Sequence, residues 1–327
     1  MANLKTTYMG LELKNPVIIG SSGLTQSVSA VKKLADNGAG AVVLKSLFEE
    51  QILLDAQKTA GDNQNDYPGA EEYIAAYTKD KQLVDFLDFV GDTKKAVDIP
   101  VIASINCVSD SDWISYAAKI EEAGVDALEL NVAILPSSVK TSSAENEKKY
   151  FAISEKVKAK VSIPVSLKMS HYSAGLAKLI QQLSFTGHVD GFVLFNRYYR
   201  PDIDIVNMKL TTSSIYSTPD EIAASLRWIA LLSGSIETDL VASTGVHDGA
   251  GVIKQLLAGA NAVQLVSAIY ERGAEYIREV LKDIEEWMDQ KGYKNIEDFR
   301  GILSYDLAQN PAVFERTQFM KYYSELH

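Results

Sequence analysis

The sequence predicts a (β/α)8 barrel that is preceded by a short β-hairpin. Eight apolar segments of strand length recur along the chain, each is followed by a segment with helical spacing, and three of the joints share one glycine-containing design. Eight such units over roughly 300 residues suit a barrel somewhat longer than the typical ~250 residues. A doubly wound open sheet is the alternative, because periodicity alone does not prove that the sheet closes.

The predicted strands are buried on both faces. Each is a run of aliphatic or β-branched residues without polar alternation, which is typical of a parallel sheet covered by helices. The segment before the first strand, TTYMGLELKNP, predicts the extra hairpin. In chain order the eight strands are 17–20, 41–45, 101–106, 127–131, 165–169, 191–195, 240–243 and 262–266.

Turn residues mark where the predicted helices end. Gly38, Gly124 and Gly259 each lie between a helix and the next strand, where glycine readily adopts the left-handed conformation. Pro100 and Pro164 precede two strands and block helix continuation. Because no linker-like composition and no abrupt change in charge interrupts the pattern, we expect residues 1–327 to form a single domain.

Composition narrows the class of protein. Of the 327 residues 46% are hydrophobic, which is enough for a large core, and the net charge of −11 argues against nucleic acid as a partner. The single cysteine, Cys107, excludes an internal disulfide, a multi-cysteine metal site and an iron–sulfur cluster in this chain, so we predict no metal. No apolar run resembles a membrane span or a signal peptide, so we expect a cytoplasmic protein without a membrane partner.

Polar residues gather at the carboxyl ends of the predicted strands, where barrel enzymes carry their active sites. Lys45 and Lys168 would meet Asn106, Asn131 and Asn196 at one mouth. Two positive charges beside several amide groups suit an electron-rich heterocycle.

A phosphate site is predicted after the last two strands, where barrels commonly bind phosphate through backbone N–H groups. Thr244 and Gly245 end the seventh strand, and Ser267 follows the eighth. Together with the lysines and asparagines, these residues predict a ligand with a polar ring at one end and a phosphate at the other.

These motifs resemble the flavin-binding barrel of the dihydroorotate dehydrogenases. The resemblance is carried, in family order, by Asn15-Pro16 followed by GSSG, and by VLKS, IASINCVSDSDW, DALELN, VSLKM, LFN, STGV and QLVSAI. It extends from Asn15 to about Arg272, and the run from IPVIAS to DALELN is especially similar to a domain of dihydropyrimidine dehydrogenase. It implies a homodimeric oxidoreductase that transfers hydride from a dihydropyrimidine CH–CH bond to FMN.

The resemblance also implies a role for each matching position. Lys168 would hold the N1–O2 edge of the flavin, where the reduced ring carries negative charge, and Lys45 and Asn131 would join it as catalytic residues. The substrate would be bound by Asn63, Asn131, Asn196 and Arg197. FMN would be bound by Ser21, Ser22, Gly23, Lys45, Ser46, Asn106, Asn131, Lys168, Asn196, Thr244, Gly245, Val266 and Ser267.

The sequence departs from the family at the catalytic base. The family has a cysteine or serine three residues after the asparagine that Asn131 matches, whereas this chain has Ile134, which cannot accept a proton. Ser137 is the substitute candidate, and His171, directly after the fifth strand, is in reserve.

A second departure follows Asn196, where RYYRPDID replaces the small residues of the family. Arg197 and its neighbours would gate the pocket or grip an anionic substrate, or they would form a solvent loop with aromatic packing. Two other functions stay open. One is a flavin-binding homologue that acts on another substrate or is not catalytic, and the other is a non-redox phosphate-sugar barrel in which Lys45 and Lys168 would be Schiff-base candidates.

Overall fold

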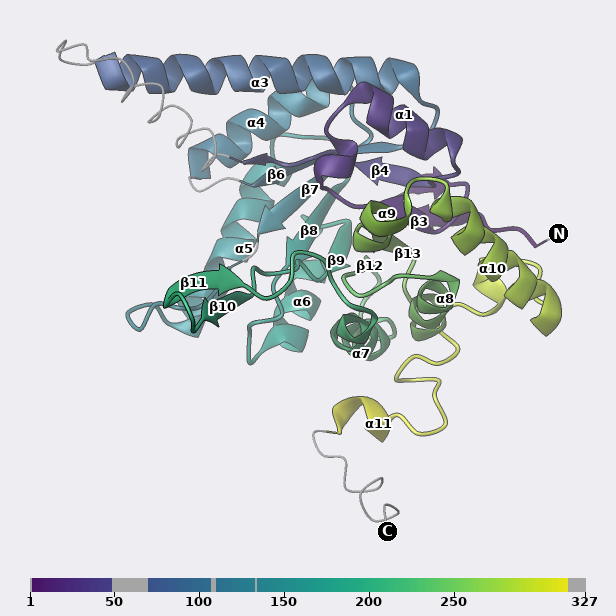
Figure 1. The fold of residues 1–327 in the computed structure, drawn as a ribbon. Coiled ribbons are helices and arrows are strands. Elements are labelled where there is room, and N and C mark those ends of the chain that lie inside the picture. Colours follow the sequence, from purple (N-terminus) through teal and green to yellow (C-terminus); the bar gives the residue numbers. More distant parts are fainter. Residues whose placement is uncertain (1, 49–69, 107–109, 133, 317–327) are drawn as a thin grey trace.

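Eight parallel strands close into a barrel in the computed structural model, which describes residues 2–48, 70–106, 110–132 and 134–316 (Figure 1). The strand order β4–β3–β13–β12–β9–β8–β7–β6 is completed by pairing of β4 with β6, which excludes an open sheet. A short strand, β5 (Leu47–Phe48), also pairs with β6. The eight strands are β3 (Val17–Ile19), β4 (Ala41–Val43), β6 (Val101–Asn106), β7 (Ala127–Val132), β8 (Val165–Met169), β9 (Gly191–Leu194), β12 (Asp239–Ser243) and β13 (Ala262–Leu265).

Helices surround the barrel and cover the outer face of the strands (Figure 1). Tyr116, Ala117 and Ile120, which are spaced to share one face of α4, are buried. Within the described part of the chain, no helix is long and apolar enough to cross a membrane. The helices are α1 (Val28–Asp36), α3 (Ala70–Ala96), α4 (Asp110–Glu122), α5 (Ser143–Lys158), α6 (Leu176–Ser184), α7 (Ile222–Leu232), α8 (Gly249–Ala258), α9 (Ser267–Arg272), α10 (Tyr276–Lys291) and α11 (Ala312–Glu315), with short 3-10 turns η1 (Gly23–Thr25), η2 (Pro219–Glu221) and η3 (Ile296–Asp298).

The predicted N-terminal hairpin closes the amino end of the barrel. Its strands β1 (Thr6–Tyr8) and β2 (Leu11–Leu13) are antiparallel and joined by Met9 and Gly10, both of which have positive φ, as two-residue hairpin turns require. Tyr8 and Met9 are buried in one cluster with residues at the starts of the barrel strands, such as Ile18 and Ala127. The opposite end, where the strands finish, is left for the site.

Alternate residues of most barrel strands belong to two different cores. In β7, Leu128 and Leu130 belong to the core under the helices, whereas Ala127 belongs to the inner cluster closed by the hairpin. Further along the strands the buried residues become polar, and they include Ser104, Glu129, Ser166, Lys168, Ser243 and Gln264. An apolar floor therefore supports a polar layer below the mouth of the barrel.

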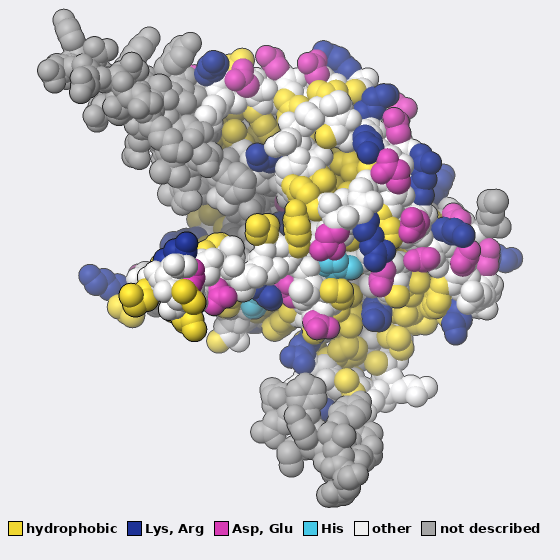
Figure 2. Space-filling view, in the orientation of Figure 1, with side chains coloured by type: hydrophobic (Ala, Val, Ile, Leu, Met, Phe, Trp, Pro, Cys, Tyr) yellow, Lys and Arg dark blue, Asp and Glu magenta, His cyan; other side chains and the backbone are white. Residues whose placement is uncertain are grey.

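A second hairpin projects from the barrel after β9 (Figure 1). It consists of β10 (Pro201–Asp204) and β11 (Lys209–Thr212), in a region where the sequence predicted only a loop. Its apolar side chains lie at the surface (Figure 2), and Ile205, Met208 and Leu210 are 83%, 88% and 82% exposed.

Candidate active site

A cavity of about 420 Å³ lies at the carboxyl ends of β8, β9, β12 and β13. Its volume falls within the roughly 300–1,000 Å³ of small-molecule and cofactor sites. Gln264, Tyr216, Ser217 and Tyr270 also line it, although the sequence did not single them out as site residues. The sequence-predicted residues that line it are Ser21, Lys168, Asn196, Arg197, Thr244, Gly245, Val266 and Ser267.

A lysine and a glutamine line the buried end of this cavity, and a buried carboxylate contacts both of them. Lys168 Nζ donates a hydrogen bond to Gln264 Oε1 at 2.8 Å and lies 3.6 Å from Glu129 Oε1. Gln264 Nε2 donates to Glu129 Oε2 at 2.6 Å. Asn131, which pairs with Lys168 between β7 and β8, carries a buried Oδ1 that accepts no hydrogen bond from the described residues. A buried acceptor of this kind fits a ligand that brings its own N–H donor.

The other end of the cavity is rich in hydroxyl and N–H donors. The hydroxyls of Ser217 and Ser267 are 3.0 Å apart, and His247 Nε2 lies 3.0 Å from Ser217 Oγ. Gly245 has a φ of +81°, and a Cβ placed on it would lie 2.1 Å from the backbone N of Ile222. Only glycine fits there, and its backbone lines the cavity directly. Donors of this type are suited to a phosphate.

Arg197 binds backbone carbonyl groups in one wall of the cavity and a neighbouring carboxylate. Its guanidinium donates to the carbonyl oxygens of Ile215 at 2.8 Å and Tyr216 at 2.9 Å, and its Nε donates to Glu221 at 3.1 Å. The backbone N–H of Ser217, which follows directly, donates to Ser267 Oγ. The segment 214–217 is thereby held across the phosphate-type end, so the gripping role that the sequence suggested for Arg197 is directed at the protein itself.

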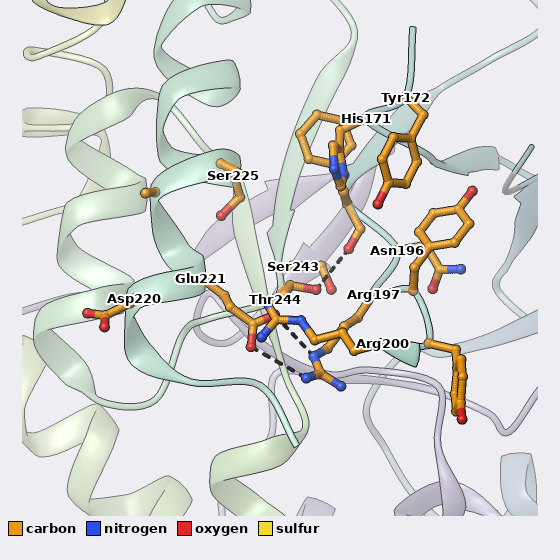
Figure 3. A pocket seen from close by; sticks show the side chains of 15 residues that line it. His171, Tyr172, Asn196, Arg197, Arg200, Asp220, Glu221, Ser225, Ser243 and Thr244 are labelled. Carbon is orange, nitrogen blue, oxygen red and sulfur yellow. Dashed lines mark hydrogen bonds and ion pairs between the residues drawn. The ribbon is translucent and has the colours of Figure 1, made fainter. Parts of the chain in front are cut away.

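Glu221 is the common partner of two arginines, and Figure 3 shows both side chains reaching it. Arg200 Nη2 lies 3.0 Å from Glu221 Oε2, the same oxygen that accepts from Arg197 Nε. Burial raises the pKa of the Glu221 carboxyl, but the Thr218 N–H and the two guanidinium groups outweigh burial and hold that pKa below its ordinary 4.5. The carboxylate is therefore ionised at neutral pH, and the clamp on segment 214–217 is a charged one.

A second cavity of about 360 Å³ adjoins the first and shares Asn196, Arg197, Ser243 and Thr244 with it (Figure 3). Its aromatic wall includes His171, whose ring centroid lies 4.2 Å from that of Tyr172. Burial lowers the pKa of the His171 imidazole below its ordinary 6.5, so the ring is neutral at pH 7. A neutral imidazole is thus available next to the cavity that holds Lys168.

Several predicted site residues lie outside the first cavity. Lys45 is exposed, and its Nζ donates to Gln26 Oε1 at 3.3 Å. Ser46 stays close to the site, because its hydroxyl lies 2.9 Å from that of Ser21. Asn131 is the neighbour of Lys168 in the sheet but does not itself line this cavity. The other predicted positions are Ser22 and Gly23 at the start of η1, Asn106 at the end of β6, Ser137 exposed after β7, and Asn63, which like Cys107 falls outside the described residues.

Ile134, at the family's base position, lines a separate cavity of about 290 Å³. Its backbone N–H donates to Tyr150 Oη at 3.4 Å, and its side chain packs against the outer core. None of the residues around this cavity lines the one that holds Lys168. Ile134 and Lys168 therefore line two different cavities.

Comparisons with known proteins find the same family, dihydroorotate dehydrogenase, over most of the chain. Residues 64–288, more than half of the chain, match the family model for dihydroorotate dehydrogenase. The chain is 26% identical to the catalytic subunit of dihydroorotate dehydrogenase B (NAD(+)) from Thermoplasma volcanium, over 92% of this chain and 99% of that protein. It is 29% identical to the subunit of the same name from Methanosarcina mazei, over 91% of this chain and 95% of that protein.

Proposed function

We propose that this chain, which belongs to the dihydroorotate dehydrogenase family, binds FMN in the cavity that holds Lys168 and oxidises a CH–CH bond of a dihydropyrimidine-like substrate. One observation carries the proposal: a single cavity has a buried lysine at one end and a cluster of hydroxyl and N–H donors at the other. These two ends suit the N1–O2 edge and the phosphate of FMN, and the unpaired Asn131 Oδ1 suits a ring N–H donor.

Bound FMN would supply the hydride acceptor, and the residues of the chain would orient both ligands. Lys168 places positive charge where the reduced ring is negative. Asn131 and Asn196 each offer a donor and an acceptor to the alternating C=O and N–H groups of a pyrimidine. For the proton, we favour His171 over the exposed Ser137, because the imidazole is neutral and lines the cavity next to Asn196.

The visible spectrum of the purified protein tests this function. We expect a flavin spectrum that is retained on gel filtration and is bleached by dihydroorotate without air. A protein that stays colourless after incubation with FMN would contradict the proposed cofactor. A protein that is reduced by dithionite but not by dihydroorotate would keep the cofactor and reject the substrate.

Reduction by dithionite but not by dihydroorotate would favour a flavoprotein that acts on another substrate. The position of Ile134 in a separate cavity supports that alternative. The non-redox alternative has less support, because it needs a free lysine amine. Lys168 is bound to Gln264 and lies beside Glu129, and Lys45 lies outside the cavity.

We also propose that residues 1–327 act as one cytoplasmic domain and that two copies associate through the β10–β11 hairpin. Its exposed Met208 and Leu210 are the apolar surface that such an interface would bury. Leu210→Asp should then give a monomer in analytical ultracentrifugation.

Because the relatives are named catalytic subunits, electrons would leave the flavin through a second protein.

A further inference from the structure

A carboxylate is buried inside the barrel, behind the lysine of the proposed flavin site. Glu129 is 1% exposed and lies in the apolar strand β7. Burying a charge is unfavourable unless the charge is paired and hydrogen-bonded. Its Oε2 accepts from Gln264 at 2.6 Å, whereas its Oε1 accepts no hydrogen bond from the described residues and lies 3.6 Å from Lys168 Nζ.

Three strands bring this group together. Glu129 comes from β7, Lys168 from β8 and Gln264 from β13. The Gln264 amide connects the two charges, because its oxygen accepts from Lys168 and its nitrogen donates to Glu129. An ammonium has three N–H donors, and Gln264 takes one of them, so Lys168 keeps donors for a ligand. Lys168 and Gln264 line the cavity, and Glu129 lies beneath them.

We infer that Glu129 is a positioning residue that balances the charge of Lys168 and so lowers the reduction potential of the bound flavin. The inference rests on the proposed function, because it needs FMN in this cavity. Lys168 alone would favour the reduced ring, which is anionic at N1–O2. The carboxylate behind it cancels part of that field, and buried charges are weakly screened. The reduced flavin is then a stronger donor to the next electron acceptor.

Glu129→Gln tests the inference because it removes the charge and keeps the shape. At a fixed potential set by a reference dye, we expect the ratio of reduced to oxidised FMN to rise about tenfold, which is about 30 mV for a two-electron couple. Glu129→Asp keeps the charge and should stay near the wild-type potential. If Glu129 only filled space, Glu129→Gln, which keeps the shape, would leave the potential unchanged, and only the shorter Glu129→Asp would shift it. An unchanged or lower potential in Glu129→Gln would overturn the inference.

A second measurement does not use flavin. In the apoprotein, Lys168→Met leaves Glu129 buried without its counter-charge, so thermal unfolding should occur at a lower temperature. Adding Glu129→Gln to that variant should restore part of the loss. Equal melting temperatures for the single and double variants would overturn the charge balance. A wild-type protein that does not bind FMN would instead overturn the proposed function and leave this result in force.

Discussion

Replacement of Gly245 by alanine tests the phosphate end of the cavity. The residue has a φ of +81°, and a Cβ there would lie 2.1 Å from the backbone N of Ile222, at the start of α7. Gly292 is a matched control, because its φ is +79° and nothing lies within 4 Å of the position of its Cβ. Gly292→Ala should therefore show the backbone penalty alone, of about 1–2 kcal/mol.

Gly245→Ala adds a contact with backbone that cannot rotate away, and overpacking of this kind costs about 1–3 kcal/mol more. Urea unfolding of the two apoproteins should show that difference. Gly245→Ala should also release FMN more readily, measured by recovery of free-flavin fluorescence, because Ile222 can give way only by moving the cavity wall. Equal stabilities within about 0.5 kcal/mol, the usual scatter of neutral substitutions, would refute the steric argument.

Four further variants test other parts of the site. Arg197→Ala should weaken FMN binding at least tenfold and lower the free energy of unfolding by about 1–3 kcal/mol, because it frees segment 214–217. Arg200→Ala loses only a half-exposed ion pair, so it should lower the free energy of unfolding by less than about 1 kcal/mol in the same urea assay. Ile134→Cys should raise dihydroorotate turnover less than about tenfold, because position 134 faces the separate cavity; a larger gain in anaerobic flavin reduction would show that the loop rearranges. Glu221 has a lowered pKa in the fold, so its stabilisation is present above its ordinary 4.5 and is lost as pH falls through the lowered value. The difference in unfolding free energy between wild type and Glu221→Gln should therefore shrink on acidification, and a constant difference would contradict the charged clamp.

The sequence predicts the barrel well, because the apolar runs mark the buried strands and the turn residues mark the ends of the helices. Gly259, predicted to end a helix, ends α8 with a φ of +115°. Each of the eight predicted strands overlaps an observed one, and the ends differ by two residues at most. The sequence does not predict the β10–β11 hairpin, because its alternating apolar residues are exposed and do not form one of the continuous apolar runs that identify the barrel strands.

The site is less predictable because it depends on which residues face each other across the barrel. Glu129 and Gln264 lie 135 positions apart and are 2.6 Å apart in space. In sequence each is a polar residue inside a largely apolar strand, and nothing in that strand identifies the partner on the other strand. Lys45 illustrates the reverse case, since the strand-end rule brings it to the mouth and its side chain turns to Gln26 at the surface.

The cofactor end and the reaction end of this site are built from different parts of the fold. Lys168 and Gln264 belong to barrel strands, and Gly245 is fixed by contact with α7, so these positions are held by the core. The proton acceptor of the family would lie on the loop after β7, where Ile134 now packs against the outer core. Loops change with little effect on the elements that they connect. The barrel therefore keeps the cavity that we propose for flavin whatever the loop does, and a change of substrate needs no change in Lys168. Reduction of the bound flavin by a substrate other than dihydroorotate would be the direct consequence.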